Sequence, residues 1–321
     1  FFFGCGRPHA SESGGEGSSS GADKLMQMPN LWKIVPRPLG HKEHRVFNDK
    51  GAAAAQSTSL SDTASGLLKA VKQAKGDFMD GQSVAFGGIE QLANELAAIK
   101  DVDLVATGEG TQHNVLLAFW LNVYNSLVLH ATMKSCADEG IRYSSSLIPR
   151  DLLGGNFFDA AAYAIGSHVF TLNDIEHGIL RSNKGGPTYL NLGTGGVMGQ
   201  FKVWDDRRRF VLKSGDLRIH FALNCGAKSC PPINAYSAEE VQSQLTVASK
   251  AFLGPGGGVE IEDDRVVMSP LMMWYSRDFG YTNKQRVHSV SPFLEPAIRA
   301  RVEALVQQHG ITWAPYNWSF A

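Results

Sequence analysis

The stretch HNVLLAFWLNVYNSLVLHATM, residues 113–133, is the most apolar part of the chain and decides its fold. A helix that is apolar on every side is buried, either in a protein core or in a membrane. The longest apolar run is interrupted by Asn122, Asn125 and Ser126, and no run reaches the ~18 apolar residues of a membrane span. We therefore predict a central core helix and no membrane span.

Two asparagines stand three positions apart in this helix, which places Asn122 and Asn125 on one face. Asparagine is a poor helix former, and a buried amide needs hydrogen-bond partners. The two side chains either tether neighbouring loops or orient a histidine and bind polar groups of a substrate, and these roles are compatible. Trp120 and Tyr124 are most simply core residues.

Helices and short strands alternate irregularly around the central helix. This pattern favours a single α+β domain, with several surrounding helices and a small, mainly antiparallel sheet, over a doubly wound sheet. In the first half of the chain we predict helices at 60–71 and 89–99, strands at 163–165 and 168–170 around a Gly166–Ser167 turn, and a helix through 175–181 opened by a Thr171–Asp174 capping box. In the second half we predict a strand at 216–224, a helix from a Ser237–Glu240 cap to near Gly254 and a hairpin at 259–268. A short helix through 274–280 and a last helix from Ser291–Pro292 to Gly310 follow.

The chain changes character near residue 58. Residues 11–21, SESGGEGSSSG, have the composition of a flexible linker, and the following stretch to residue 56 is polar and contains three prolines. We predict that residues 1–57 are disordered or extended and that residues 58–321 form the domain. Because the chain begins FFFGCGRPH, without methionine, we expect it to be a fragment of a longer chain.

Composition argues against several classes of protein. The 321 residues are 43% hydrophobic and 19% charged, as in ordinary globular proteins, and the net charge of −1 creates no global field that attracts nucleic acid or an anionic membrane. Three consecutive arginines, 207–209, form a local basic patch that we interpret as a solvated loop.

The glycine-rich GTGGVMG, 193–199, has Met198 where a dinucleotide-binding fingerprint needs glycine, so we expect a mobile loop and no cofactor. Four cysteines in so long a chain form no disulfide framework, which favours a reducing, cytoplasmic location.

The stretch HFALNCGAKSCPP, residues 220–232, carries the strongest candidate for chemistry. Cys225 follows the strand predicted at 216–224, and the chain then turns at Gly226. Free N–H groups of Gly226, Lys228 and Ser229, together with the Lys228 cation, would favour a thiolate or an oxyanion there. The alternative is that Cys225 is a buried, inert thiol, as unpaired cysteines usually are.

A nucleophilic thiol needs a base within about 3 Å. His220 lies on the predicted strand, but five strand residues span about 16 Å, so a pair with Cys225 requires the strand to end early or fold back. His177, opposite the core face of its helix, is the other candidate base. The same spacing argues against zinc held by His220, Cys225 and Cys230, and we expect two free thiols and no metal.

Six motifs occur in order along the chain: FWLNVYNSLVLHA (119–131), LNDIEHGILR (172–181), DLRIHFALNCGAKSCPPI (216–233), YSAEEVQSQLTVASKAFL (236–253), WYSRDFG (274–280) and YNWSFA (316–321). Together they resemble the domain of unknown function 547 family over about residues 60–321. The chain departs from the family at Leu217, where proline is usual, at Asn317, where aspartate is usual, and in an expanded 182–209 segment.

The resemblance implies little about activity, because the family is named for its missing function and carries over no catalytic residues. The coiled-coil, DEP and glutaredoxin-like domains of its plant members suggest signalling or scaffolding. Some members have glycine at the position of Cys230 and asparagine at that of His177, which counts against an obligatory zinc site and against His177 as an obligatory base.

Two functional hypotheses remain open. In the first, the chain is a cysteine-dependent hydrolase or acyltransferase acting on a peptide or acyl substrate, with Cys225 as nucleophile and His220 or His177 as base. Asn122 or Asn125 would orient the base, and the turn at 225–229 would supply oxyanion donors. In the second, the chain is a non-catalytic domain that binds a protein partner in signalling. Neither hypothesis involves nucleic acid.

Overall fold

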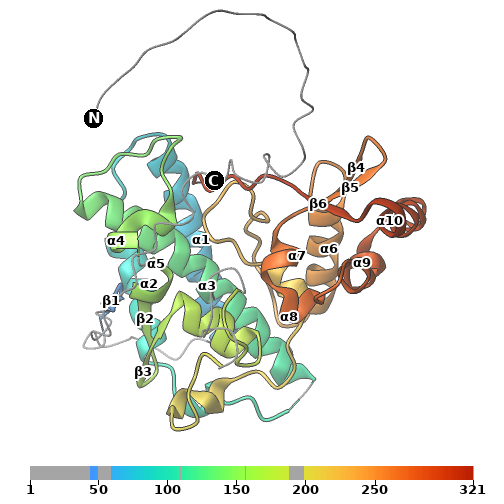
Figure 1. Ribbon diagram of the computed structural model, residues 1–321. Helices are drawn as coiled ribbons and strands as arrows, with labels where there is room; N and C mark the ends of the chain where they lie inside the picture. The colour runs from blue at the N-terminus through green and yellow to red at the C-terminus, as the bar shows by residue number, and fades with distance from the viewer. Residues whose placement is uncertain (1–43, 50–58, 109, 156, 188–198, 321) are drawn as a thin grey trace, which may run out of the picture. The chain divides into compact units, whose positions relative to one another are not determined.

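The computed structural model describes residues 44–49, 59–108, 110–155, 157–187 and 199–320 (Figure 1). In this part of the chain the protein is α+β, as predicted, and a central apolar helix is surrounded by further helices and small sheets. Most of the segment predicted to be disordered or extended, 1–57, lies outside the described residues, as does most of the glycine-rich loop. The described stretch 44–49 contains the short strand β1 (Arg45–Val46).

The central helix is α3 (Thr111–Asp138), and it confirms the prediction from the apolar stretch. It is long and apolar enough to cross a membrane, but 94% of its most apolar window is buried inside the protein. Helix α1 (Leu60–Met79) lies alongside it, and α2 (Gly87–Ala97) packs against α1 (Figure 1). The side chain of Ser59 accepts a hydrogen bond from the Asp62 N–H and so caps α1.

Two three-stranded sheets replace the single, mainly antiparallel sheet of the prediction. In each sheet a hairpin is antiparallel, and the third strand pairs with it in parallel. Strands of two or three residues show no alternation of apolar and polar side chains, so the sequence did not reveal the two parallel partners. The first sheet is β1, β2 (Ala161–Ile165) and β3 (His168–Thr171), and the second is β4 (Val259–Glu262), β5 (Arg265–Met268) and β6 (Ile311–Trp313).

Several predicted boundaries shift in the second half of the chain. Ser291 and Pro292 open a single turn, η8 (Ser291–Phe293), and the last long helix begins only at Pro296. The helix before that turn was missed, although the Thr282–Gln285 capping box at its start is complete. The helices here are α6 (Val241–Leu253), α7 (Leu271–Trp274), α8 (Ser276–Phe279), α9 (Asn283–Val290) and α10 (Pro296–His309).

The prediction of a strand at 216–224 was wrong. The chain forms a 3₁₀-helix, η7 (Leu217–Phe221), because the Asp216 carboxylate accepts the Arg218 N–H and also pairs with its guanidinium. Two hydrophobic clusters flank this turn, since Ile219 packs in one and Phe221 in the other. Burial on both sides produces the alternation of apolar residues that resembles a strand. The estimate of strand length between His220 and Cys225 therefore does not apply.

Candidate functional site

Two thiols lie together on the turn that follows η7. Cys225 Sγ is 2.7 Å from Cys230 Sγ, and both residues are partly exposed and free of disulfide bonds. The hydroxyl of Tyr316, which comes from the segment after β6, is 3.0 Å from Cys230 Sγ and 3.6 Å from Cys225 Sγ. The Cys225 N–H also donates to Cys230 Sγ, at 3.2 Å. Cys230 Sγ is therefore the focus of several hydrogen-bond donors.

These contacts make the two thiols unequal. Burial alone raises the pKa of Cys230, but hydrogen bonds from the Cys225 thiol, the Tyr316 hydroxyl and two backbone N–H groups outweigh it, and the net shift lowers the pKa. The hydrogen bond to Cys230, followed by burial, raises the pKa of Cys225 well above its usual range. Cys230 is thus the more acidic thiol of the pair. The sequence singled out the other cysteine.

The backbone donors expected to bind an oxyanion are engaged within the protein. Gly226 N–H donates to the side chain of Asn224 at 2.6 Å. Lys228 N–H donates to Ser319 O at 2.8 Å, and Ser229 N–H donates to Asn317 O at 3.2 Å. The segment that carries Tyr316 therefore pairs with the turn along its main chain and covers these donors.

The turn has little room to change. Gly226 has φ = +88°, and a Cβ atom there would lie 2.7 Å from Cγ of Pro149. The position requires glycine for both reasons, which fixes the direction in which the chain leaves Cys225.

The two asparagines of α3 tether loops, which was one of the two roles considered. Asn125 donates to Ala222 O at 3.1 Å and accepts from the Asn224 N–H at 3.0 Å. Asn122 makes the same pair of bonds, at 2.8 and 3.0 Å, with the backbone of Tyr236. Neither amide contacts a histidine in these bonds. Asn125 nevertheless shapes the cysteine turn, because it holds the residue just before Cys225.

His220 pairs with a carboxylate rather than with Cys225. Its Nε2 lies 2.9 Å from Asp278 Oδ2, and its ring packs on Tyr275 with centroids 4.0 Å apart. Asp278 Oδ2 also accepts from Arg181 Nε at 2.7 Å, and Lys184 pairs with the other carboxylate oxygen. Burial would raise the pKa of Asp278, but His220, Arg181 and Lys184 together hold it well below its usual range. The imidazole is thus fixed by an ion-pair network.

His177 lies in the same network and is neutral. Arg181 NH1 is 3.1 Å from His177 Nδ1, and a guanidinium can only donate, so the ring proton is on Nε2. Burial, with the charges of Arg181 and His220, lowers the pKa of His177 to about 4 and outweighs the opposing effect of Glu176 and Asp278. In this state His177 has no free lone pair with which to act as a base.

A buried carboxylate connects this polar network to the neighbourhood of the cysteines. Glu176 accepts hydrogen bonds from Tyr124 at 2.9 Å and from Tyr275 at 2.6 Å. Burial, followed by the charges of Glu176, Tyr275 and Cys225, raises the pKa of Tyr124 well above its usual range. This tyrosine of the central helix therefore lies near both the Glu176 carboxylate and Cys225. Tyr124 is a core residue, as predicted, and its hydroxyl also binds the Glu176 carboxylate.

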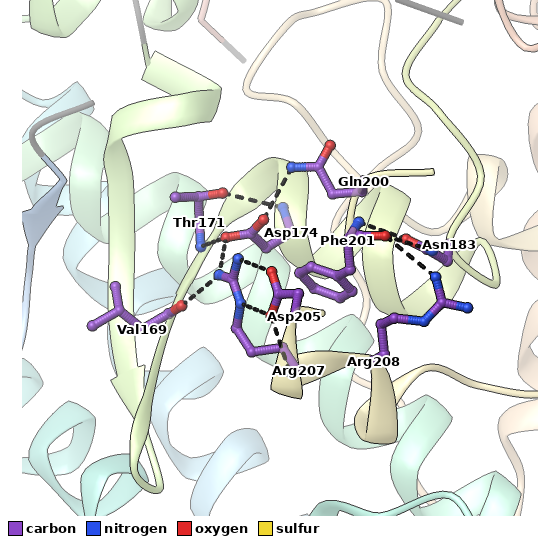
Figure 2. A network of polar contacts seen from close by, with 9 residues as sticks. All are labelled: Val169, Thr171, Asp174, Asn183, Gln200, Phe201, Asp205, Arg207 and Arg208. Carbon is purple, nitrogen blue, oxygen red and sulfur yellow. Dashed lines mark hydrogen bonds and ion pairs between the residues drawn. The ribbon is translucent and has the colours of Figure 1, made fainter. Parts of the chain in front are cut away.

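A second network holds the first residue of the helix that carries His177 (Figure 2). The predicted capping box is confirmed: Asp174 N–H donates to the Thr171 hydroxyl, and Thr171 N–H donates to the Asp174 carboxylate. Arg207 donates to the same carboxylate at 2.8 Å. The helix that follows, η4 (Asp174–Leu180), is a π-helix, so the expected helix is present with a wider turn.

Residues 109–253 match the model of a family described as a protein of unknown function, DUF547. This segment belongs to the domain of unknown function 547 family. It contains both cysteines, His177 and His220, whereas Asp278 and Tyr316 lie beyond the matched residues. No curated protein and no solved structure matches the chain.

Sequence reasoning missed four residues of this site. Tyr316, Asp278, Glu176 and Arg181 were all within quoted motifs, but none was given a role. Asp278, Glu176 and Arg181 are charged residues within largely apolar motifs. This pattern could have identified them, because a buried carboxylate requires a compensating cation. Within the described residues no three His, Cys, Asp or Glu side chains converge as metal ligands do.

Proposed function

We propose that this domain is a dithiol redox protein, in which Cys225 and Cys230 exchange with a disulfide substrate. The observation that carries the proposal is the contact of 2.7 Å between the sulfurs of two partly exposed residues, one of which has a lowered pKa. A thiolate is the attacking species in such exchange, and a second thiol within bonding reach resolves the intermediate. A cytoplasmic location, where thiol buffers keep such a pair reduced, is part of the proposal.

The reaction balances without a cofactor. The Cys230 thiolate attacks one sulfur of the substrate disulfide, forms a mixed disulfide and releases the other sulfur as a thiolate, which takes a proton from solvent. Cys225 then loses its proton and attacks Cys230 Sγ. The Cys225–Cys230 disulfide forms, and the second substrate thiol leaves. One dithiol is oxidised and one disulfide is reduced.

Two observations favour exchange over acyl transfer with Cys225 as nucleophile. His220 and His177 both have hydrogen bonds to the Asp278–Arg181 network, and no hydrogen bond joins either ring to a cysteine among the described residues. The N–H groups of the turn are also occupied by other acceptors. Disulfide exchange needs neither a general base nor an oxyanion hole. Because some family members have glycine in place of Cys230, the proposed activity belongs to this chain and is not a family trait.

Differential alkylation of the full chain tests the proposal. The protein is equilibrated with mixtures of reduced and oxidised glutathione, free thiols are trapped with iodoacetamide, and each cysteine peptide is quantified by mass spectrometry. We expect Cys225 and Cys230 to lose alkylation together as the mixture becomes oxidising, with a peptide pair linked by one disulfide.

Cys136 is the internal control. Burial, followed by the charge of Glu139, raises its pKa to about 11, so it should remain a thiol throughout. In Cys230→Ser the intramolecular disulfide cannot form. The alkylation of Cys225 should then no longer fall through formation of that disulfide as the glutathione mixture becomes oxidising. If Cys225 and Cys230 both stay fully alkylated in the most oxidising mixture, the exchange proposal is wrong and the non-catalytic binding domain is favoured.

A further inference from the structure

An exposed apolar tip stands on the loop between Phe201 and Arg207. Asp205 N–H donates to Lys202 O at 3.0 Å, which closes a four-residue turn with Val203 and Trp204 at its apex. Val203 is 84% exposed and Trp204 81% exposed, more than any other large apolar side chain of the described residues. Folding gains nothing from leaving a tryptophan in water, so this arrangement calls for another explanation.

Both sides of the tip are anchored (Figure 2). On one side Phe201 is buried, and its backbone exchanges two hydrogen bonds with the Asn183 side chain, at 2.7 and 3.1 Å. A Cβ atom at Gly178 would come within 2.4 Å of the Phe201 ring, so the anchor depends on a glycine in the helix beneath it.

On the other side Arg207 binds Asp205 and Asp174, each at 2.8 Å, and also donates to Val169 O at 3.0 Å. A tip that is held at both ends loses little conformational entropy when it binds a partner.

Cations surround the apolar tip. Lys202, Arg208 and Arg209 are exposed, against one exposed acid, Asp206. Arg207 is half-buried and neutralised by its two aspartates, and Arg209 pairs with Asp101 at 2.6 Å, so the field outside the loop comes mainly from Lys202 and Arg208. The chain as a whole has a net charge of −1, and the positive field is therefore local.

We propose that this tip is a peripheral attachment site for an anionic lipid surface, into which Trp204 and Val203 insert. Tryptophan favours the boundary between water and acyl chains, and neighbouring lysines and arginines are attracted to acidic headgroups. A stable protein interface buries about 1,200 Å² or more, which two residues at a convex turn do not supply. A lipid surface needs only the tip itself and the charges around it, so the lipid is the occupant that the loop fits.

Vesicle cosedimentation of the full chain tests this proposal independently of the cysteine chemistry. Vesicles of phosphatidylcholine with phosphatidylserine should bind the protein, and vesicles of phosphatidylcholine alone should bind it far less. Trp204→Ala should weaken binding by about tenfold or more, because the indole supplies most of the inserted apolar area. Arg208→Gln should weaken it roughly fivefold, and high salt should weaken it further.

Tyr281→Ala is the matched control, since Tyr281 is 65% exposed but lies outside this loop. It should bind as the wild type does, and far-ultraviolet circular dichroism should show all variants folded. The proposal is overturned if wild-type protein ignores anionic vesicles, if neutral vesicles bind it equally well, or if Trp204→Ala binds unchanged.

Discussion

The hydroxyl of Tyr316 lies 3.0 Å from the sulfur of Cys230, although 86 residues separate them in the chain. The tyrosine ring packs against both Trp274 and Trp318, with centroids 4.9 and 4.6 Å away, and the two indoles stack on each other. Burial, followed by the charges of the two cysteines, raises the pKa of Tyr316 well above its usual range, so the hydroxyl stays protonated and donates. The cysteine pair is therefore completed by a residue from outside the matched family segment.

Replacing Tyr316 with phenylalanine should raise the pKa of Cys230. The change removes one hydrogen bond to a thiolate, worth about 1.5–3 kcal/mol, which corresponds to roughly one to two pH units. Labelling of Cys230 by iodoacetamide, followed peptide by peptide against pH, should shift to higher pH by that amount. Tyr281→Phe, the same change at an exposed tyrosine, should leave the curve in place. An unshifted curve in Tyr316→Phe would mean that the hydroxyl does not stabilise the thiolate.

The two asparagines of the central helix provide a matched pair of variants. Asn122→Ala and Asn125→Ala each remove two buried hydrogen bonds, so both should lower the free energy of unfolding by about 2–4 kcal/mol in urea titrations. Only Asn125 holds the chain before Cys225. We therefore expect Asn125→Ala alone to change the labelling rates of Cys225 and Cys230. Equal effects of both variants on labelling would contradict a local role.

The sequence predicted the central helix and both hairpins because long apolar periodicity and turn chemistry are local signals. It also identified the turn at Cys225, but it gave Cys230 no role. It assigned a strand to 216–224, because alternation arises equally from a turn buried between two hydrophobic clusters. A local pattern does not distinguish these two kinds of burial.

The partners of the site were beyond sequence reasoning for a different reason. Asp278 meets His220 across 58 residues and Arg181 across 97. No periodicity encodes which distant carboxylate neutralises a buried cation. His220 was kept as a candidate base for Cys225 although its spacing on a strand argued against the pair, and tertiary packing gives it Asp278 as its partner instead.

Stability should fall as the pH drops from about 6.5 to 4. Burial is the main cause that lowers the pKa of both His177 and His130 to about 4 in the folded protein, against 6.5 for an unperturbed histidine. The unfolded chain therefore binds more protons in this window, and each histidine contributes about 3 kcal/mol that is present above pH 6.5 and lost toward pH 4. Below that window Glu176 and Asp278, whose pKa values are lowered, act in the same direction.

His177→Asn tests this assignment, because the amide oxygen still accepts from Arg181 but does not titrate. Urea titrations at pH 7, 6 and 5 should show roughly half of the wild-type loss of stability, the remainder coming from His130. A variant with the full wild-type slope would mean that His177 is not a buried neutral imidazole.

The last prediction separates a structural His220 from a catalytic one. In His220→Gln the carboxylate of Asp278 keeps Arg181 and Lys184 but loses the imidazole, and the aromatic packing on Tyr275 is disturbed. We expect the free energy of unfolding to fall by about 2–4 kcal/mol, as for other losses of a partner in a buried ionic network.

The pH dependence of iodoacetamide labelling at Cys225 and Cys230 should stay as in the wild type, because their acidity is set by each other, by Tyr316 and by backbone N–H groups. Labelling is measured at urea concentrations where the variant is fully folded. If His220→Gln instead slows labelling of Cys225 while the fold persists, the imidazole activates that thiol, and the acyl-transfer hypothesis replaces disulfide exchange.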